Sequence, residues 1–167
     1  DPPWRDEKIS SKALRRSRLA EAAGLAVDRG VVVDDRLRTS DRSIWAAGDV
    51  ARYPWRGDSI RIEHWVVAQR QGQAAARNIL GADEPFRDAP FFWSQHYDVP
   101  IAYVGHAADF DRTLVSGSAA DRDVLVGFEA DGEIRAVASI YRDLDNLRAE
   151  LALELIEPGR LAELFRS

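Results

Sequence analysis

The 167-residue chain contains no cysteine. Structural disulfides, thiolate zinc sites and a cysteine nucleophile are therefore excluded within it. No apolar run approaches the ~20 residues that a helix needs to cross a bilayer, and no segment has the charged start and apolar centre of a signal peptide. The net charge of -5 argues against nucleic acid as the main partner, because phosphate backbones require a basic face. These absences favour a cytoplasmic protein that binds neither nucleic acid nor membrane.

Composition and length favour a soluble globular protein with one full domain or two small pieces. Hydrophobic residues make up 46% of the chain and charged residues 31%. A polar stretch with prolines at its edge, residues 83–90, predicts a domain boundary near Asp88. The glycines are scattered singly and never form Gly-x-Gly-x-x-Gly, so the chain lacks the sequence that cradles a dinucleotide pyrophosphate.

The segment Ile44–Val50 predicts a short buried strand that ends at Gly48-Asp49. Glycine allows another molecule to approach the backbone closely. The aspartate places an acceptor at the carboxyl end of the strand, where open α/β sheets hold their ligands. This acceptor suits a hydroxyl-rich group such as ribose or ribitol. An ordinary strand-to-loop turn is the alternative interpretation of the same pair.

A second signal follows at Glu63-His64-Trp65, after a loop rich in proline, glycine and charge that runs from Arg52 to Arg61. A helical pattern then runs to about Asn78. Its small and apolar residues share a face that would pack closely against a sheet or a flat ring: Ala68, Gly72, Ala75, Ala76 and Ile79.

Together these segments resemble the second flavin-binding segment of a known family. The residues concerned are Thr39-Ser40, Ile44–Val50, Glu63–Trp65, Gln71-Gly72 and Ala75–Gly81. The family is that of the FAD-dependent, NAD(P)H-using reductases of the ferredoxin, rubredoxin and putidaredoxin reductase type, related to the apoptosis-inducing-factor oxidoreductases. Pro90–Ser94 and Tyr97-Asp98 resemble the start of that family's C-terminal domain. The resemblance runs from roughly Arg18 to the end of the chain.

The resemblance implies a flavin site. Asp49, after Gly48, would bind the ribitol, Glu63 and His64 would lie beside the isoalloxazine and the nicotinamide, and Trp65 would pack close by. Trp93 would reach back to cover the two rings, where a large flat side chain excludes water. In the alternative interpretation Glu63 caps the helix, His64 lies on the surface, and both tryptophans fill the core.

The remaining pattern predicts an α+β chain, in which the end of a FAD-binding α/β domain (1–88, with 1–17 unassigned) precedes a C-terminal antiparallel sheet domain with covering helices (89–167). In the first part a short helix ends at Gly24 and residues 27–37 form a strand. The second part has strands at 91–94, 101–105, 112–116, 124–129 and 134–141. A helix then begins at Asp143 as N-cap, with one face formed by Leu144, Leu147, Leu151 and Leu155, and another begins near Pro158.

We therefore expect the carboxyl-terminal part of a reductase that passes hydride from NAD(P)H to FAD and electrons to a ferredoxin-like, rubredoxin or Rieske-type carrier. Alone it is expected to be inactive, and a homodimer is one expected assembly. A docking patch could form from Arg52, Arg56 and Arg61. A non-enzymatic interaction or dimerisation domain is the alternative. We assign no catalytic residue and no metal ligand in this chain, and the preference between NADH and NADPH stays open.

Overall fold

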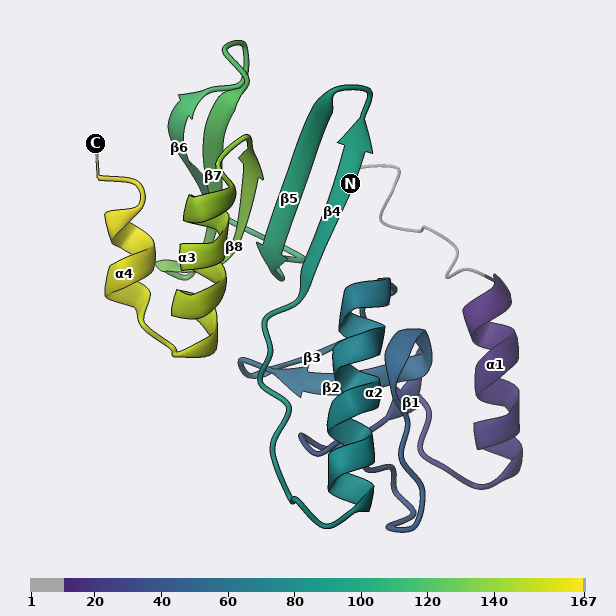
Figure 1. Cartoon of the computed structure of the whole chain (residues 1–167). Coiled ribbons are helices and arrows are strands. Elements are labelled where there is room, and N and C mark those ends of the chain that lie inside the picture. Colours follow the sequence, from purple (N-terminus) through teal and green to yellow (C-terminus); the bar gives the residue numbers. More distant parts are fainter. Residues whose placement is uncertain (1–10, 167) are drawn as a thin grey trace. The chain divides into compact units, whose positions relative to one another are not determined.

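The computed structural model describes residues 11–166, with side-chain surroundings from Ser17 onward. The chain divides into two compact units, Asp1–Arg87 and Asp88–Ser167. Within the described residues there are a three-stranded mixed sheet, a five-stranded antiparallel sheet, four α-helices and one short 3-10 helix (Figure 1). The α+β class predicted from the sequence is confirmed.

The first unit is built around a small sheet whose strands lie in the order β1-β2-β3. Strand β2 runs parallel to β1 and antiparallel to β3. Tyr53 of β2 packs edge-to-face on Phe86, with ring centroids 5.6 Å apart, and both rings are buried. The elements are α1 (Ser11–Ala22), β1 (Val31–Val32), η1 (Gly48–Val50), β2 (Ala51–Trp55), β3 (Asp58–Ile60) and α2 (Trp65–Ile79).

The predicted end of the first helix is confirmed. Gly24 adopts a positive φ of 76°, and the N–H of Leu25 donates to the carbonyl of Ala20. A residue without Cβ closes a helix at such a position without strain. The helix begins earlier than the pattern indicated, at Ser11. Residues 1–10 of the unassigned stretch 1–17 lie outside the described residues.

The strand predicted before Gly48-Asp49 is wrong, and so is the loop predicted after it. Residues 44–47 form only an isolated bridge, between Trp45 and Arg38, and Gly48 opens the 3-10 helix η1. Residues 51–60 instead form a β-hairpin, because Tyr53 and Trp55 turn alternately into the core and the Arg56-Gly57 turn adopts positive φ at both residues.

Helix α2 is confirmed, but the face predicted to be buried is wrong. Of the small residues proposed for it only Ala75 is buried, whereas Gly72, Ala76 and Ile79 are exposed. The face that packs against the rest of the unit is displaced by about one residue. It consists of Val67, Gln71, Ala74, Ala75 and Asn78, of which Gln71 and Asn78 are polar. A search for apolar residues alone does not find this face, because two of its buried side chains, Gln71 and Asn78, are amides that bind backbone groups.

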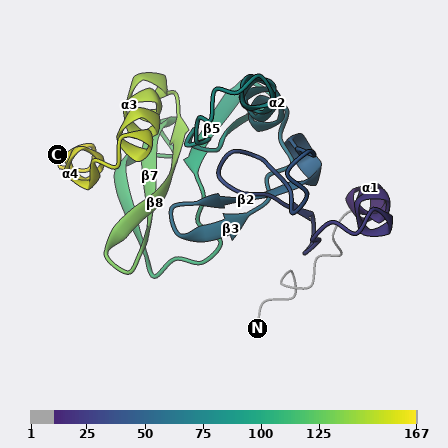
Figure 2. The ribbon, with the colours of Figure 1, turned by 90° about the horizontal axis from the view of Figure 1, so that it is seen from below.

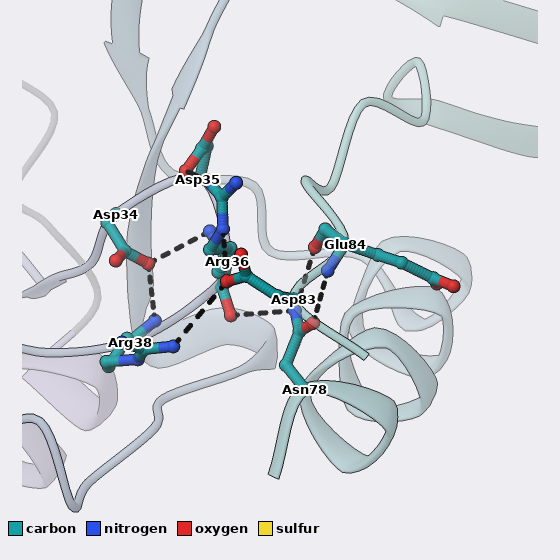
Figure 3. A network of polar contacts seen from close by, with 7 residues as sticks. All are labelled: Asp34, Asp35, Arg36, Arg38, Asn78, Asp83 and Glu84. Atoms are coloured by element: carbon teal, nitrogen blue, oxygen red, sulfur yellow. Dashed lines mark hydrogen bonds and ion pairs between the residues drawn. The ribbon is translucent and has the colours of Figure 1, made fainter. Parts of the chain in front are cut away.

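A polar network fixes the far end of α2 (Figure 3). Asn78 donates to the carbonyls of Arg36 and Glu84 at 3.1 and 2.9 Å, and its Oδ1 accepts the N–H of Glu84 at 2.7 Å. Arg36 pairs with Asp83 at 2.6 Å. Asp34 accepts the N–H groups of residues 36 and 38, which closes the turn after β1. The end of the helix is thus tied to the loop that follows β1.

The second unit contains the antiparallel sheet β4-β5-β8-β7-β6. All five predicted strands are confirmed; four of them are longer than predicted, and the last is displaced by one residue towards the N-terminus. Asp131 and Gly132 both adopt positive φ in the hairpin between the last two strands, as a two-residue turn of this kind requires. The strands are β4 (Phe91–His96), β5 (Val99–Gly105), β6 (Arg112–Ser118), β7 (Asp123–Ala130) and β8 (Glu133–Ile140).

Two helices, α3 (Asp143–Glu154) and α4 (Pro158–Glu163), cover one face of this sheet (Figures 1 and 2). Pro158 opens α4 as predicted. The cap predicted for α3 is wrong by one residue, because Arg142 occupies that position and makes no side-chain capping bond. The leucines predicted to share one face of α3 are 48–60% exposed, while Ala149, Ala152 and Leu153 pack inward.

Replacing Asn146 by leucine is expected to raise the free energy of unfolding by about 1–2 kcal/mol. Asn146 is 2% exposed, and neither of its amide atoms has a hydrogen-bond partner among the described residues. Urea denaturation measures the change. Asn78→Leu is the matched control, which removes hydrogen bonds that are made and should lower stability. A stability loss in both variants would contradict this account of Asn146.

Candidate functional site

The site predicted from the sequence lies in the first unit, where η1 meets α2. Gly48 has a φ of 78°, and its N–H donates to Oε1 of the fully buried Gln71 at 2.7 Å. A Cβ at Gly48 would lie 3.2 Å from the Cβ of Ala68. Gly48 is therefore required twice, by its backbone conformation and by the close approach of α2.

Asp49 follows as an exposed residue. Its backbone carbonyl accepts from Nη1 of Arg61 at 2.9 Å. No hydrogen bond to its carboxylate is found among the described residues, although this charge acts on the nearby His64. Asp49 thus presents an acceptor to solvent beside the start of α2. This is the arrangement that a hydroxyl-bearing ligand needs.

The start of α2 is fixed by two side chains. The Nδ1 atom of His64 accepts the N–H of Val66 at 3.4 Å, so His64 is the N-cap. The carboxylate of Glu63 pairs with Arg61 at 2.7 Å. The alternative in which Glu63 caps the helix is therefore wrong. Helix α2 has 15 residues, and the partial positive charge at its N-terminus favours an anionic group in front of it.

Both tryptophans of the predicted site are exposed. Trp65 is 59% and Trp93 is 50% exposed, so the alternative in which they fill the core is wrong. Trp93 lies in the second unit on β4, an edge strand, opposite Ala102 of β5. Large aromatic rings left open to solvent are available to cover a ligand or a partner.

The arginine patch considered from the sequence is not supported by the structure. Arg52 is held by Asp28 and Ser59, and Arg61 by Asp49 and Glu63. The side chains of Arg52 and Arg61 are only 15% and 13% exposed. They hold the first unit together rather than offer free charge to a partner.

Lowering the pH is expected to weaken the cap of α2. Burial lowers the pKa of His64, and the charge of Asp49 partly opposes this. The folded state therefore prefers neutral His64, whose Nδ1 can accept. This stabilisation is complete above the ordinary pKa of ~6.5 and is lost as the pH falls through the lower folded pKa. The expected loss is at most about 1 kcal/mol, measured by urea denaturation between pH 7 and pH 5.

The control for this effect is His64→Asn, which keeps a capping acceptor that does not titrate. It should show a weaker fall in stability than the natural chain over the same pH range. Equal falls in both proteins would contradict the role of His64 as a titrating cap.

Comparison with known proteins finds similar sequences for both parts of the chain. Residues 14–72 match the family described as pyridine nucleotide-disulphide oxidoreductase, and residues 91–159 match the reductase C-terminal family. The ferredoxin–NAD(+) reductase component of an anthranilate 1,2-dioxygenase system from Burkholderia cepacia is 40% identical over 151 residues, which are 87% of this chain and 37% of that protein. The chain is therefore similar to the ferredoxin reductases over most of its own length.

Putidaredoxin reductases are similar to this chain as well. Putidaredoxin reductase CamA from Pseudomonas putida is 35% identical over 76% of this chain and 31% of its own length. The crystal structure of a covalent putidaredoxin reductase–putidaredoxin complex superposes with a TM-score of 0.81 and 32% identity, over 91% of this chain and 37% of that one. The chain thus spans about a third of the length of these relatives. Reductases of this family use FAD and NAD(P)H.

The residues at η1 and α2 fit a flavin. Gly48 allows η1 to pack closely against α2, Asp49 presents its carboxylate to solvent, and Gln71 has a buried Nε2 without a partner among the described residues. Gln71 and Arg61 were not predicted as flavin-site residues. Gln71 belongs to the Gln71-Gly72 pair of the flavin-like segment, and a polar residue on the inner face of a helix was its signal. In the part of the chain that is described, no cluster of three potential metal ligands occurs, and no helix is long and apolar enough to span a bilayer.

Proposed function

We propose that this chain is the carboxyl-terminal part of a flavoprotein reductase, called here the parent reductase. Residues 1–88 supply the end of its FAD-binding domain and residues 89–167 its C-terminal domain. The parent reductase passes hydride from NAD(P)H to FAD and single electrons to a ferredoxin-like or Rieske-type carrier in the cytoplasm. The observation that carries this proposal is the exposed Asp49 held beside the N-terminus of α2, within a sequence of this family.

Each proposed site residue has a physical task. Asp49 accepts from ribitol hydroxyls. FAD supplies the hydride chemistry when bound, and reduction places negative charge on one edge of its ring. The N-terminal turn of α2, closed by His64, stabilises such charge through its dipole and free N–H groups. Glu63 and Trp65 border the ring. Trp93, whose side chain is 50% exposed on β4 of the second unit, is proposed to exclude water from the flavin on the family resemblance alone. No proton-transfer residue is assigned in this chain.

A chimera tests the proposal. This chain replaces the matching third of the ferredoxin–NAD(+) reductase component from Burkholderia cepacia, to which it is 40% identical. The chimera is expected to purify with FAD and to reduce ferredoxin with NADH. The same chimera with Trp93→Ala should retain FAD but reduce ferredoxin more slowly. A chimera that folds without FAD would contradict the proposal.

A homodimer contacting through α3 is a second proposal, and the exposed leucine stripe favours it. The stripe consists of Leu144, Leu147, Leu151 and Leu155. Beside it lies a hollow of about 380 Å³, lined by Arg148, Leu151, Arg160, Glu163 and Leu164. Apolar surface, a hollow and charges of both signs on one face suit a second copy of this chain, because a twofold interface must be complementary to itself.

Replacing Leu151 by glutamate is expected to abolish this dimer, because the charge would be buried at its centre. Sedimentation equilibrium measures the assembly. Leu80→Glu is the matched control, since Leu80 is 88% exposed in the first unit, and it should leave the assembly unchanged. A natural chain that stays monomeric up to millimolar concentration would rule out the dimer without touching the flavin proposal.

A further inference from the structure

We infer that Arg61 is a positioning residue for the proposed flavin site. It holds Asp49 and Glu63 at a fixed distance from each other. The inference rests on the proposed function. Arg61 lies between β3 and α2, in a segment without regular structure. Its side chain is only 13% exposed. Burying a guanidinium costs free energy unless the group is paired, so the pairing of Arg61 matters for its position.

The pairing joins the two halves of the site. The Nη1 atom of Arg61 donates to the backbone carbonyl of Asp49 at 2.9 Å and lies 2.7 Å from Oε1 of Glu63. One nitrogen therefore binds the residue proposed for the ribitol and a residue proposed for the ring. Charge-assisted bonds of this length are among the strongest polar contacts in proteins.

Gly30 makes room for this side chain. A Cβ on Gly30 would lie 2.7 Å from Cδ of Arg61 and 2.9 Å from the carbonyl oxygen of Val50. Gly30 does not have a positive φ, so its backbone conformation does not require glycine. Glycine is required here because Cδ of Arg61 and the carbonyl of Val50 occupy the space that a Cβ would need. Arg61 is thus positioned by contacts with Gly30, with Asp49 of η1 and with Glu63.

The second tie on η1 comes from the body of α2. Gln71 binds the N–H of Gly48 at 2.7 Å, and Arg61 binds the carbonyl of the next residue, Asp49. Gln71 fixes η1 against the helix, whereas Arg61 alone links it to Glu63. A flavin must meet the ribitol acceptor and the start of α2 together. A loose register between them costs affinity and catalytic geometry, since small misplacements cost up to ~10²-fold in rate.

Hydrogen exchange of the chain without flavin tests the tie directly. Arg61→Met is expected to speed amide exchange at residues 48–52 at least tenfold, and Arg61→Lys to give an intermediate effect. Arg52→Met is the matched control, because it removes an equally buried arginine that binds Asp28 and Ser59 instead. Unchanged exchange at residues 48–52 in Arg61→Met would overturn the inference. If that variant fails to fold, Arg61→Lys decides in its place, and an exchange pattern like that of the natural chain overturns it.

Flavin binding provides the second readout, on the chimera described above. Arg61→Met should lower its FAD affinity about tenfold and shift the visible flavin band, and Arg61→Lys should restore part of both. Faster exchange with unchanged FAD affinity and spectrum would reduce Arg61 to a structural residue and overturn the inference. If the unsubstituted chimera binds no FAD, the proposed function itself fails, while the exchange data still report whether Arg61 ties η1 to Glu63.

Discussion

Replacing Asp49 by alanine is expected to weaken FAD binding by about 10- to 100-fold. A hydrogen bond to a charged group is worth about 1.5–3 kcal/mol, which corresponds to this range of affinity. The carboxylate of Asp49 is exposed and makes no hydrogen bond among the described residues, so its loss removes a ligand contact without unpairing a group of the protein. The fold should remain intact.

Fluorescence quenching of FAD by the chimera measures this change. Asp58→Ala is the control, since Asp58 is another exposed carboxylate of the first unit, at the start of β3. It should bind FAD as tightly as the unsubstituted chimera. Equal affinities for all three proteins would show that Asp49 does not contact the flavin.

Replacing Gly105 by alanine is expected to destabilise the second unit by about 2–5 kcal/mol, since overpacking and a positive φ each cost about 1–3 kcal/mol. The new Cβ would lie 2.3 Å from the carbonyl oxygen of Arg135 and 2.9 Å from Cα of Ala136. Both are backbone atoms and have little room to move. The N–H of Gly105 also donates to the carbonyl of Pro90 at 2.8 Å, so the change should disturb the strand that carries Trp93.

Gly132→Ala separates the two causes of this loss. Gly132 also has a positive φ, but a Cβ there would meet nothing within 4 Å. This variant should lose only the free energy of unfolding that results from placing alanine at a positive φ, about 1–2 kcal/mol. Urea denaturation followed by circular dichroism compares the two variants. Equal losses would contradict the close contact described for Gly105.

The second unit could be predicted from the sequence better than the first. Its short strands follow one another at roughly regular spacing, Asp131-Gly132 marks a hairpin, and Pro158 marks the start of a helix. Such signals are local, so tertiary contacts do not override them. The leucines of α3 were predicted to share one face, and periodicity shows no more than that. It does not show which face the sheet covers, and here smaller residues such as Ala149 and Ala152 fill that space.

The first unit misled prediction where polar side chains serve the backbone. Gln71 and Asn78 face inward because they bind main-chain groups of Gly48 and Glu84. The hairpin of residues 51–60 was hidden by Pro54 and its charged neighbours. Proline normally argues against a strand.

The candidate site was predicted in part. Asp49 and Glu63–Trp65 lie at η1 and the start of α2, where Arg61 contacts both Asp49 and Glu63. Arg61, which makes that junction, was taken for a docking residue, because a contact across 12 residues of sequence leaves no periodic signal. The roles of Asp49, Glu63, His64, Trp65 and Trp93 towards a flavin stay predictions.

The most direct test of the flavin site is the amide NMR spectrum of the ¹⁵N-labelled chain during titration with FAD to millimolar concentration. Because the pyrophosphate cradles are absent from this sequence, weak binding is expected, and NMR detects weak binding. The account predicts that resonances of residues 48–50 and 63–68 shift together and that Asp49→Ala abolishes these shifts. Shifts confined to another surface, or no shifts at all, would contradict a flavin site at this junction.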